Sequence, residues 1–197
     1  MLKVAITGNI ASGKSEVEKM LLNMGFKVAD TDKINHFILM SDYSAILEIK
    51  QAFKDEDILD ENGAISREKL GRIVFSSLEK KLKLEEILHK RIFNKVEDFF
   101  KENANRDIVF VSIPLLFETN QQDIFDKIIF VSADVDVRVD RLIKRNGYTK
   151  EYALTRINAQ DDELSKIQKS DFVIFNNSNF INLQNQVRSI LEKLINV

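Results

Sequence analysis

Residues 8–15, GNIASGKS, constrain the fold of this chain more than any other stretch, because they fit the pattern G-x-x-x-x-G-K-[ST]. In loops of this kind backbone N–H groups surround the phosphates of a nucleoside triphosphate, the lysine reaches the β- and γ-phosphates, and the last hydroxyl contacts Mg²⁺. The flanking residues suit the motif, since 2–7 read as a short apolar strand and 15–24 as a helix with one apolar face. Lys14 and Ser15 are therefore predicted to bind nucleotide phosphates and the metal.

Gly8 and Gly13 stand at the two ends of this loop. Without a Cβ atom the backbone can bend so that successive amides point inward, and the N-terminus of the following helix adds its partial positive charge. The alternative is a glycine-rich turn that contains a lysine by coincidence. The strand before it and the helix after it favour phosphate binding.

Length and charge narrow the class of protein. The 197 residues suffice for one domain with a core of its own, with or without an insertion. The 29 basic residues nearly balance the 31 acidic ones, so no overall basic field favours a nucleic acid as partner. No cysteine is present, which excludes disulfides, thiolate metal sites and thiol catalysis. Because Met1-Leu2-Lys3 leads straight into the first strand and no apolar run is long enough to span a bilayer, we expect a cytoplasmic protein without a membrane partner.

Short apolar segments separated by helical patterns predict the strands of one sheet: residues 4–7, 27–29, 108–113, 127–131 and 172–175. Continuous apolar strands that alternate with helices are typical of a parallel sheet covered on both faces. The predicted fold class is α/β, a three-layer fold around a five-stranded parallel sheet. Ligands are expected outside the carboxyl ends of the strands, where the phosphate loop lies.

The second strand runs into Asp30-Thr31-Asp32. If this segment is extended, residues two apart share a face, so both carboxylates project together near the phosphates. A carboxylate there can ligate Mg²⁺, directly or through water, or accept a proton from an attacking hydroxyl. The alternative is a helix N-cap with a solvated neighbour. Asp32 is the stronger catalytic candidate of the two.

Residues 35–103 contain no strong strand and are too many for a simple crossover. Their apolar spacing predicts helices, with Ser66 as a helix cap and a turn at 60–63. We expect a helical insertion over the carboxyl edge of the sheet, placed to bind an acceptor substrate, although core packing explains its apolar stripe equally well. His89 lies in this insertion and either contacts an anion or caps and packs a helix.

The third strand ends in residues 112–118, SIPLLFE, which include Pro114 and Glu118. No aspartate ends this strand, whereas ATP-driven motors and switches with this loop usually place one there to help hold Mg²⁺. That absence counts against a motor or a switch. On pattern alone, a proline that halts the strand and a solvated glutamate explain these two residues.

Arg138, Arg141 and Arg145 are spaced by three and four on a helix predicted over 134–145, so their guanidinium groups lie along one face. Such a row can clamp a phosphoryl group and neutralise the charge that develops during transfer. Because aspartates stand close by, an exposed ion-paired face is an equal alternative. A glycine turn and a second charged helix follow, so residues 133–164 resemble a mobile lid.

Residues 176–179, NNSN, form a polar turn after the last strand. Such a loop can approach the base of a nucleotide, with Asn176 as its first residue, but a solvated turn is the default interpretation. The apolar spacing over 183–194 predicts a closing amphipathic helix.

Taken together, these segments resemble the dephospho-CoA kinase family of P-loop small-molecule kinases. The resemblance runs from Thr7 to about Asn177 and depends on an ordered set of motifs rather than on the loop alone. Besides the loop, the motifs are VADTD at 28–32, NGAISR at 62–67, Leu88-His89, IPLLFE at 113–118, RINAQ at 156–160 and SDFVI at 170–174 with Asn176.

This resemblance implies transfer of the γ-phosphate of ATP to the ribose 3′-hydroxyl of dephospho-CoA, which completes coenzyme A, with Mg²⁺ as cofactor. It implies one domain with a core over about 1–34, 104–132 and 165–197, a helical CoA-binding insertion over about 35–103 and a lid over about 133–164. ATP and dephospho-CoA are the implied partners.

The resemblance also implies the site residues. The catalytic residues are Asp32, Lys14, Arg138 and Arg141. The ATP-binding residues are Gly8, Ala11, Ser12, Gly13, Lys14, Ser15, Glu16 and Asn176. The substrate-binding residues are Thr7, Asp32, His89, Pro114, Leu115 and Glu118. Ser15 is the expected metal contact, with Asp32 acting on the metal through water.

Some positions depart from the family pattern. Asn9 and Ala11 replace the usual glycines, Glu16 stands where threonine is common, and Lys90 replaces the proline that normally follows the histidine. Asn9 and Ala11 occupy free positions of the loop motif, so we expect little effect on phosphate binding.

Two other functions stay open from the residues alone. One is a kinase for a nucleoside or another small alcohol, and the other is a regulatory ATP-binding module without transfer activity. Asp32 and the lid arginines favour catalysis over a module, and the long insertion favours a large acceptor.

Overall fold

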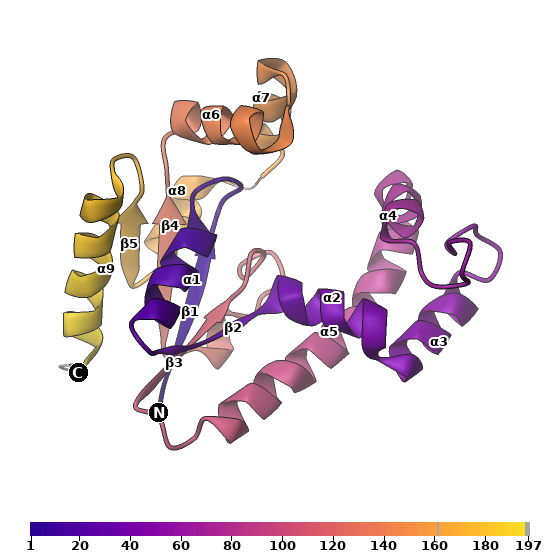
Figure 1. The fold of residues 1–197 in the computed structure, drawn as a ribbon, viewed down its shortest axis with the longest axis horizontal. Coiled ribbons are helices and arrows are strands. Elements are labelled where there is room, and N and C mark those ends of the chain that lie inside the picture. The colour runs from indigo at the N-terminus through magenta and orange to yellow at the C-terminus, as the bar shows by residue number, and fades with distance from the viewer. Residues whose placement is uncertain (161, 196–197) are drawn as a thin grey trace. The chain divides into compact units, whose positions relative to one another are not determined.

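The computed structural model of the chain describes residues 1–160 and 162–195, which fall into two compact units. Unit 1 comprises Met1–Ala29 and Asn103–Val197, and unit 2 comprises Asp30–Glu102. Figure 1 shows the elements. In chain order they are β1 (Leu2–Gly8), α1 (Lys14–Asn23), β2 (Lys27–Asp30), α2 (Thr31–Ser41), α3 (Tyr43–Ala52), α4 (Arg67–Ser76), α5 (Leu78–Glu102), β3 (Ile108–Ser112), the short 3-10 helix η1 (Gln122–Ile124), β4 (Lys127–Ser132), α6 (Val135–Asn146), α7 (Lys150–Asn158), α8 (Glu163–Gln168), β5 (Phe172–Phe175) and α9 (Phe180–Ile195).

The sheet has the strand order β2-β3-β1-β4-β5. β1 pairs in parallel with β3 and with β4, so that Val4 lies opposite both Phe110 and Lys127, and β4 pairs in parallel with β5. β3 is buried along its whole length, as an uninterrupted apolar run predicts for an interior strand. The predicted α/β class with a five-stranded parallel sheet is confirmed.

Helices α1 and α9 pack over one face of the sheet and form the core of unit 1 with it. Val17 and Leu21 of α1 cluster with Ile6 of β1 and with Val187 and Leu191 of α9, and each of the five is at most 7% exposed. Full burial of such a side chain is worth about 1.5–3 kcal/mol. This packing fixes α1, and with it the loop that precedes α1, against the sheet.

The two helices predicted for the lid are present. α6 and α7 lie side by side in Figure 1, and Gly147 between them has a φ of +67°. The short helix α8 that follows was not predicted. Within residues 1–160 and 162–195, no helix combines the length and the apolarity needed to cross a membrane.

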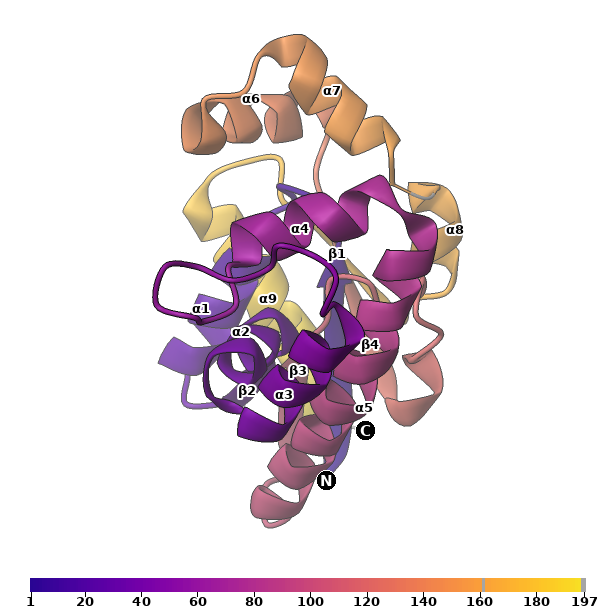
Figure 2. The ribbon, with the colours of Figure 1, turned by 90° about the vertical axis from the view of Figure 1, so that its right-hand side faces the viewer.

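Unit 2 is helical and has a core of its own. Figure 2 shows α2, α3 and α4 grouped around the long helix α5. Ile38, Ile49, Leu70 and Leu88, one from each of these helices, are buried in this core. The predicted helices of the insertion are therefore confirmed.

Two local predictions in unit 2 are confirmed as well. Ser66 caps α4, because its hydroxyl accepts a hydrogen bond from the N–H of Lys69. Residues 60–63 form a turn in which the N–H of Gly63 donates to the carbonyl oxygen of Asp60, and Gly63 has a φ of +75°.

The expectation of an extended Asp30-Thr31-Asp32 segment is wrong. α2 begins at Thr31, and the Asp30 carboxylate caps it by accepting hydrogen bonds from the N–H groups of Asp32 and Lys33. Because Thr31 and Asp32 are helical, the two carboxylates do not share one face of a strand. Asp30 therefore has the alternative role, a helix cap, and Asp32 is an exposed residue of the first turn.

Asp42 caps α3, and its removal gives a stability prediction. Its carboxylate accepts from the N–H of Ala45 at 3.0 Å and from the Ser44 hydroxyl at 2.8 Å, and Arg91 Nε lies 3.8 Å away. These contacts, the Ala45 N–H above all, hold the pKa of Asp42 below its usual value. We expect Asp42→Ala to lower the free energy of unfolding by about 1 kcal/mol, the usual contribution of an N-cap, in urea titrations near neutral pH.

This contribution depends on pH with a defined sign. A carboxyl whose pKa is lower in the folded chain stabilises the fold fully above its unfolded pKa of about 4, and the effect is lost as the pH falls through the folded value. The difference between the parent chain and Asp42→Ala should therefore shrink in urea titrations below about pH 4. An equal difference at neutral and acid pH would contradict the cap.

Candidate active site

The loop between β1 and α1 has the open backbone that a phosphate site requires. Gly13 is the N-cap residue of α1 with a φ of +98°, and no side chain caps this helix. Among the residues that the structure describes, the N–H groups of Gly13, Lys14 and Ser15 donate to no acceptor. Unbonded amides at a helix N-terminus attract anions, because they add to the positive end of the helix dipole.

Both glycines of the loop occupy positions where a side chain does not fit. A Cβ atom at Gly8 would lie 2.4 Å from the carbonyl oxygen of Val131, and one at Gly13 would lie 2.0 Å from Asn176 Nδ2. Ala11 has a φ of +58°, a left-handed conformation that costs an L-residue about 1–2 kcal/mol. The loop is thus held in a conformation that the isolated sequence would not favour.

Lys14 belongs to a buried polar cluster. Its Nζ donates to Glu18 Oε1 at 2.9 Å and also to Ser112 Oγ, and the Ser112 hydroxyl donates to Glu18 Oε1 at 2.5 Å. The side chains of Lys14 and Glu18 are 12% and 5% exposed. Sequence reasoning missed Glu18. Its spacing of four from Lys14 places both side chains on one face of a helix, and this spacing could have indicated the pair.

Arg141 and Asn176 hold the loop from α6 and from the end of β5. Arg141 Nη1 donates to the carbonyl oxygens of Ala11 at 3.1 Å and Ser12 at 2.9 Å, and Nη2 donates to that of Asn176 at 2.9 Å. Asn176 Nδ2 in turn donates to the Ser12 carbonyl oxygen at 2.9 Å. Burial lowers the pKa of Arg141. Asn176 is 6% exposed, so the alternative of a solvated turn is wrong for this residue.

Arg138 is 2% exposed, so the alternative of an exposed ion-paired face is wrong for it. Its Nη1 donates to Glu163 Oε2 at 3.2 Å, and Glu163 Oε1 accepts from the Ser132 hydroxyl at 2.6 Å. Burial lowers the pKa of Arg138, and the Glu163 charge opposes that change. Its Nε has no hydrogen-bond partner in the described part of the chain. Arg145 differs, being exposed and bonded to Asn146 Oδ1.

Glu118 is tied to the loop through a lysine that sequence reasoning missed. Lys166 of α8 is 5% exposed, and its Nζ donates to Glu118 Oε1 at 2.5 Å and to Asn9 Oδ1 at 3.3 Å. Thr7 Oγ1 donates to the carbonyl oxygen of Pro114 at 3.4 Å. Glu118 is therefore ion-paired with a buried lysine while 23% of its side chain stays exposed, and Leu115 is 46% exposed. No motif or spacing in the sequence marks Lys166.

Two predicted site residues, Asp32 and His89, belong to unit 2. Asp32 is exposed in the first turn of α2, and His89 is half-buried on α5 next to the core residue Leu88. Their roles stay predictions.

The loop residues fit a Mg²⁺ ion that arrives with a nucleotide. Within residues 1–160 and 162–195, no three acidic or histidine side chains are grouped as a metal site. Mg²⁺ is usually held by one or two protein oxygens together with phosphates and water. The hydroxyl oxygen of Ser15, an exposed residue beside the unbonded amides, is a suitable metal ligand of this kind.

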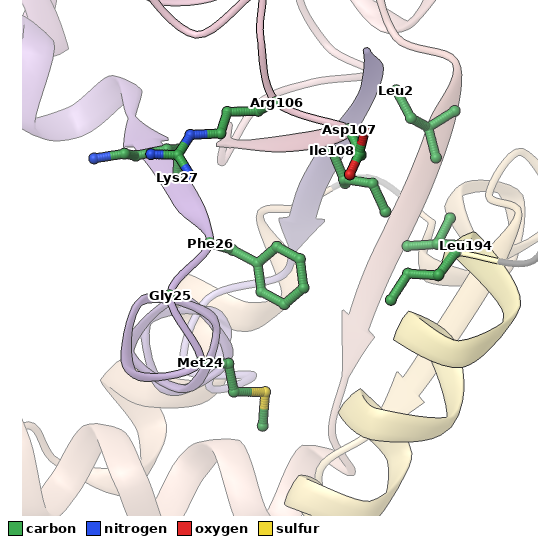
Figure 3. A pocket seen from close by; sticks show the side chains of 10 residues that line it. Leu2, Met24, Gly25, Phe26, Lys27, Arg106, Asp107, Ile108 and Leu194 are labelled. Carbon is green, nitrogen blue, oxygen red and sulfur yellow. The ribbon is translucent and has the colours of Figure 1, made fainter.

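A cavity of about 650 Å³ lies elsewhere in unit 1, at the amino ends of β1, β2 and β3 (Figure 3). Phe26, Met24 and Leu194 form its apolar part. Since the phosphate loop follows the carboxyl end of β1, this cavity is at the opposite end of the strands and contains none of the predicted site residues.

Comparisons with known proteins agree with this geometry. The model of the dephospho-CoA kinase family matches residues 2–182. A dephospho-CoA kinase of Listeria innocua is 38% identical over 197 residues, which cover 98% of this chain and 97% of that protein. A solved structure from Thermus thermophilus has a TM-score of 0.83 at 28% identity and covers 98% of this chain and 97% of its own. The dephospho-CoA kinase from Campylobacter jejuni has a TM-score of 0.74 at 28% identity, with 98% and 96% covered. The chain belongs to the dephospho-CoA kinase family.

Proposed function

We propose that this chain transfers the γ-phosphate of ATP to the ribose 3′-hydroxyl of dephospho-CoA, the last step of coenzyme A biosynthesis. The observation that carries the proposal is the loop of residues 8–15, which presents unbonded amides at Gly13, Lys14 and Ser15 in a chain of this family. A cytoplasmic location stays a prediction.

ATP would bind with its phosphates on this loop. The unbonded amides supply hydrogen-bond donors, and Lys14 supplies a cation for the β- and γ-phosphates. Asn176, which donates a hydrogen bond to the loop, would lie on the nucleoside side of the bound ATP. Ser15 would hold Mg²⁺ together with the phosphates. When bound, Mg²⁺ neutralises phosphate charge and so favours attack on the γ-phosphorus.

The lid arginines would stabilise the charge that develops during transfer. Arg138 is buried and Arg141 is half-buried, and a cation in a low-dielectric site acts more strongly on a phosphate than an exposed one. Arg138 also has an Nε–H group without a partner in the described residues. Arg141 in addition fixes the loop by its bonds to the carbonyl oxygens of Ala11 and Ser12.

Asp32 would act on the acceptor, orienting its 3′-hydroxyl or taking its proton. Asp32 is an exposed residue of the first turn of a helix that begins directly after β2, and the residue that caps this helix is Asp30. His89, Thr7, Pro114, Leu115 and Glu118 are the proposed contacts of the acceptor.

An acceptor panel tests the proposal. With ATP and Mg²⁺, we expect ADP release with dephospho-CoA to exceed release with nucleosides or small alcohols by about 100-fold or more in kcat/KM, because a large acceptor offers far more binding energy. Mass spectrometry should show one added phosphoryl group. Coenzyme A is the matched control, since its 3′-position is already phosphorylated, and it should give no product.

The other outcomes separate the alternatives. Comparable turnover of a nucleoside would make the chain a kinase of a different acceptor. Binding of ATP without ADP release for any acceptor would make it a regulatory module.

A further inference from the structure

The end of β3 lacks the carboxylate that P-loop enzymes commonly place there to help hold Mg²⁺. β3 is one of the two strands next to β1 in the sheet, with Ser112 opposite Ile6, so its end stands beside the loop in sheet order. Ser112 is fully buried and carries no charge. A nucleotide site built on this sheet therefore lacks one acidic group at its usual position.

Glu18 brings a carboxylate to that place from α1. Its Oε1 accepts from Lys14 Nζ at 2.9 Å and from the Ser112 hydroxyl at 2.5 Å, so the acidic group meets both the loop lysine and the strand end. Its Oε2 accepts no hydrogen bond from any residue that the structure describes. One oxygen is thus occupied by the protein, and the other has no protein donor.

Packing does not explain a glutamate at this position. Glu18 is 3% exposed, and Val17, Met20 and Leu21 of the same helix are buried core residues. Burial of an ionised carboxylate is unfavourable unless it is paired and hydrogen-bonded, whereas an apolar side chain would suit this site without a partner. The carboxylate at this position is instead matched to its two polar partners, the Lys14 ammonium and the Ser112 hydroxyl.

We infer that Glu18 supplies from α1 the acidic group that the end of β3 lacks: it is a positioning residue that orients Lys14 and couples Mg²⁺ binding to ATP binding. The inference depends on the proposed ATP site and extends it. Because the side chains of Glu18 and Ser112 are hydrogen-bonded to each other, the carboxylate should function from either of these two positions. An aspartate at position 112 should replace a missing glutamate at position 18.

Calorimetric binding of a non-hydrolysable ATP analogue, with Mg²⁺ or with EDTA, tests this. We expect Mg²⁺ to tighten binding to the parent chain, and Glu18→Ala and Glu18→Gln to lose about 10- to 100-fold of that gain, the usual effect of removing an outer partner of a metal site. Binding in EDTA should change little by comparison. Glu18→Gln keeps the volume and an acceptor oxygen, so it separates the charge from packing.

The double variant Glu18→Ala/Ser112→Asp should recover most of the Mg²⁺ gain. Glu192→Ala, which removes an exposed carboxylate from α9, is the control and should bind as the parent chain does. Thermal unfolding of each variant shows that it is folded. A Mg²⁺ gain that persists in folded Glu18→Gln, or a folded double variant that does not recover, would overturn the inference. A parent chain that binds no analogue under either condition would instead overturn the proposed function.

Discussion

Replacing Lys14 by alanine is expected to lower the rate of phosphoryl transfer by about 10²- to 10³-fold, the scale for removing one preorganised group that stabilises developing charge. Lys14 is the cation of the loop, and its Nζ is fixed by Glu18 and Ser112 before any nucleotide binds. Because it is pre-positioned, little reorganisation is needed when the phosphates arrive. Initial rates of ADP release at saturating dephospho-CoA, over a range of ATP concentrations, measure the loss.

The same substitution should also destabilise the fold. It leaves the Glu18 carboxylate, 5% exposed in its side chain, without its cation, and breaking a buried ion pair by removing one partner costs about 3–5 kcal/mol. Rates should therefore be compared well below the unfolding temperature of the variant, and circular dichroism should verify that the variant is folded at the temperature of the assay.

Lys19→Ala is the matched control for Lys14→Ala. Lys19 is a lysine of the same helix, and its side chain is 70% exposed, so its loss should change neither rate nor stability appreciably. An unaltered transfer rate in folded Lys14→Ala would contradict the assignment of the loop.

The strands and the loop could be predicted because both depend on local patterns. A strand buried on both faces is apolar along nearly its whole length, which residues 108–111 show directly, and a phosphate loop needs glycine where a Cβ atom would collide. The start of α2 directly after Asp30 could not be predicted, and the reason is local too. An aspartate before a helix and one at the end of a strand look alike until the next residues are known to be helical.

The polar contacts of the site could not be predicted, because they join residues far apart in the chain. Arg138 and Glu163 are 25 positions apart, and Lys166 and Asn9 are 157 apart. Periodicity reports which face of an element is buried, but the partner of a buried charge depends on how the elements pack. α8, only six residues long, shows no such periodicity, yet it supplies both Glu163 and Lys166.

These contacts connect three predicted groups of site residues. Through Glu163, α8 holds Arg138 of the lid, and through Lys166 it holds Glu118 after β3 and Asn9 in the loop. The Arg138–Glu163 and Lys166–Glu118 hydrogen bonds are charge-assisted and largely shielded from water, which makes them stronger than exposed ion pairs. Within unit 1, one short helix therefore connects α6 and the segment after β3 to the loop of residues 8–15.

Asp32→Asn is expected to lower kcat by about 10²- to 10⁴-fold, the usual range for loss of a general base. Asparagine has nearly the same size and can still orient a hydroxyl as an acceptor, but it cannot take the proton. Affinity for ATP should stay close to that of the parent chain, because the loop contacts that hold the phosphates do not involve residue 32 in the proposed mechanism. Rates at saturating substrates and calorimetric binding of an ATP analogue measure the two effects separately.

Asp30→Asn is the control for Asp32→Asn, since it makes the same chemical change two residues away. Asp30 caps α2, and asparagine caps helices about as well as aspartate, so the fold and the rate should both be retained. If Asp32→Asn turned over at the parental rate, Asp32 would have no part in the chemistry. If instead Asp30→Asn lost as much rate as Asp32→Asn while staying folded, the effect would come from the charge of this segment as a whole, and the assignment of the proton acceptor to Asp32 would have to be given up.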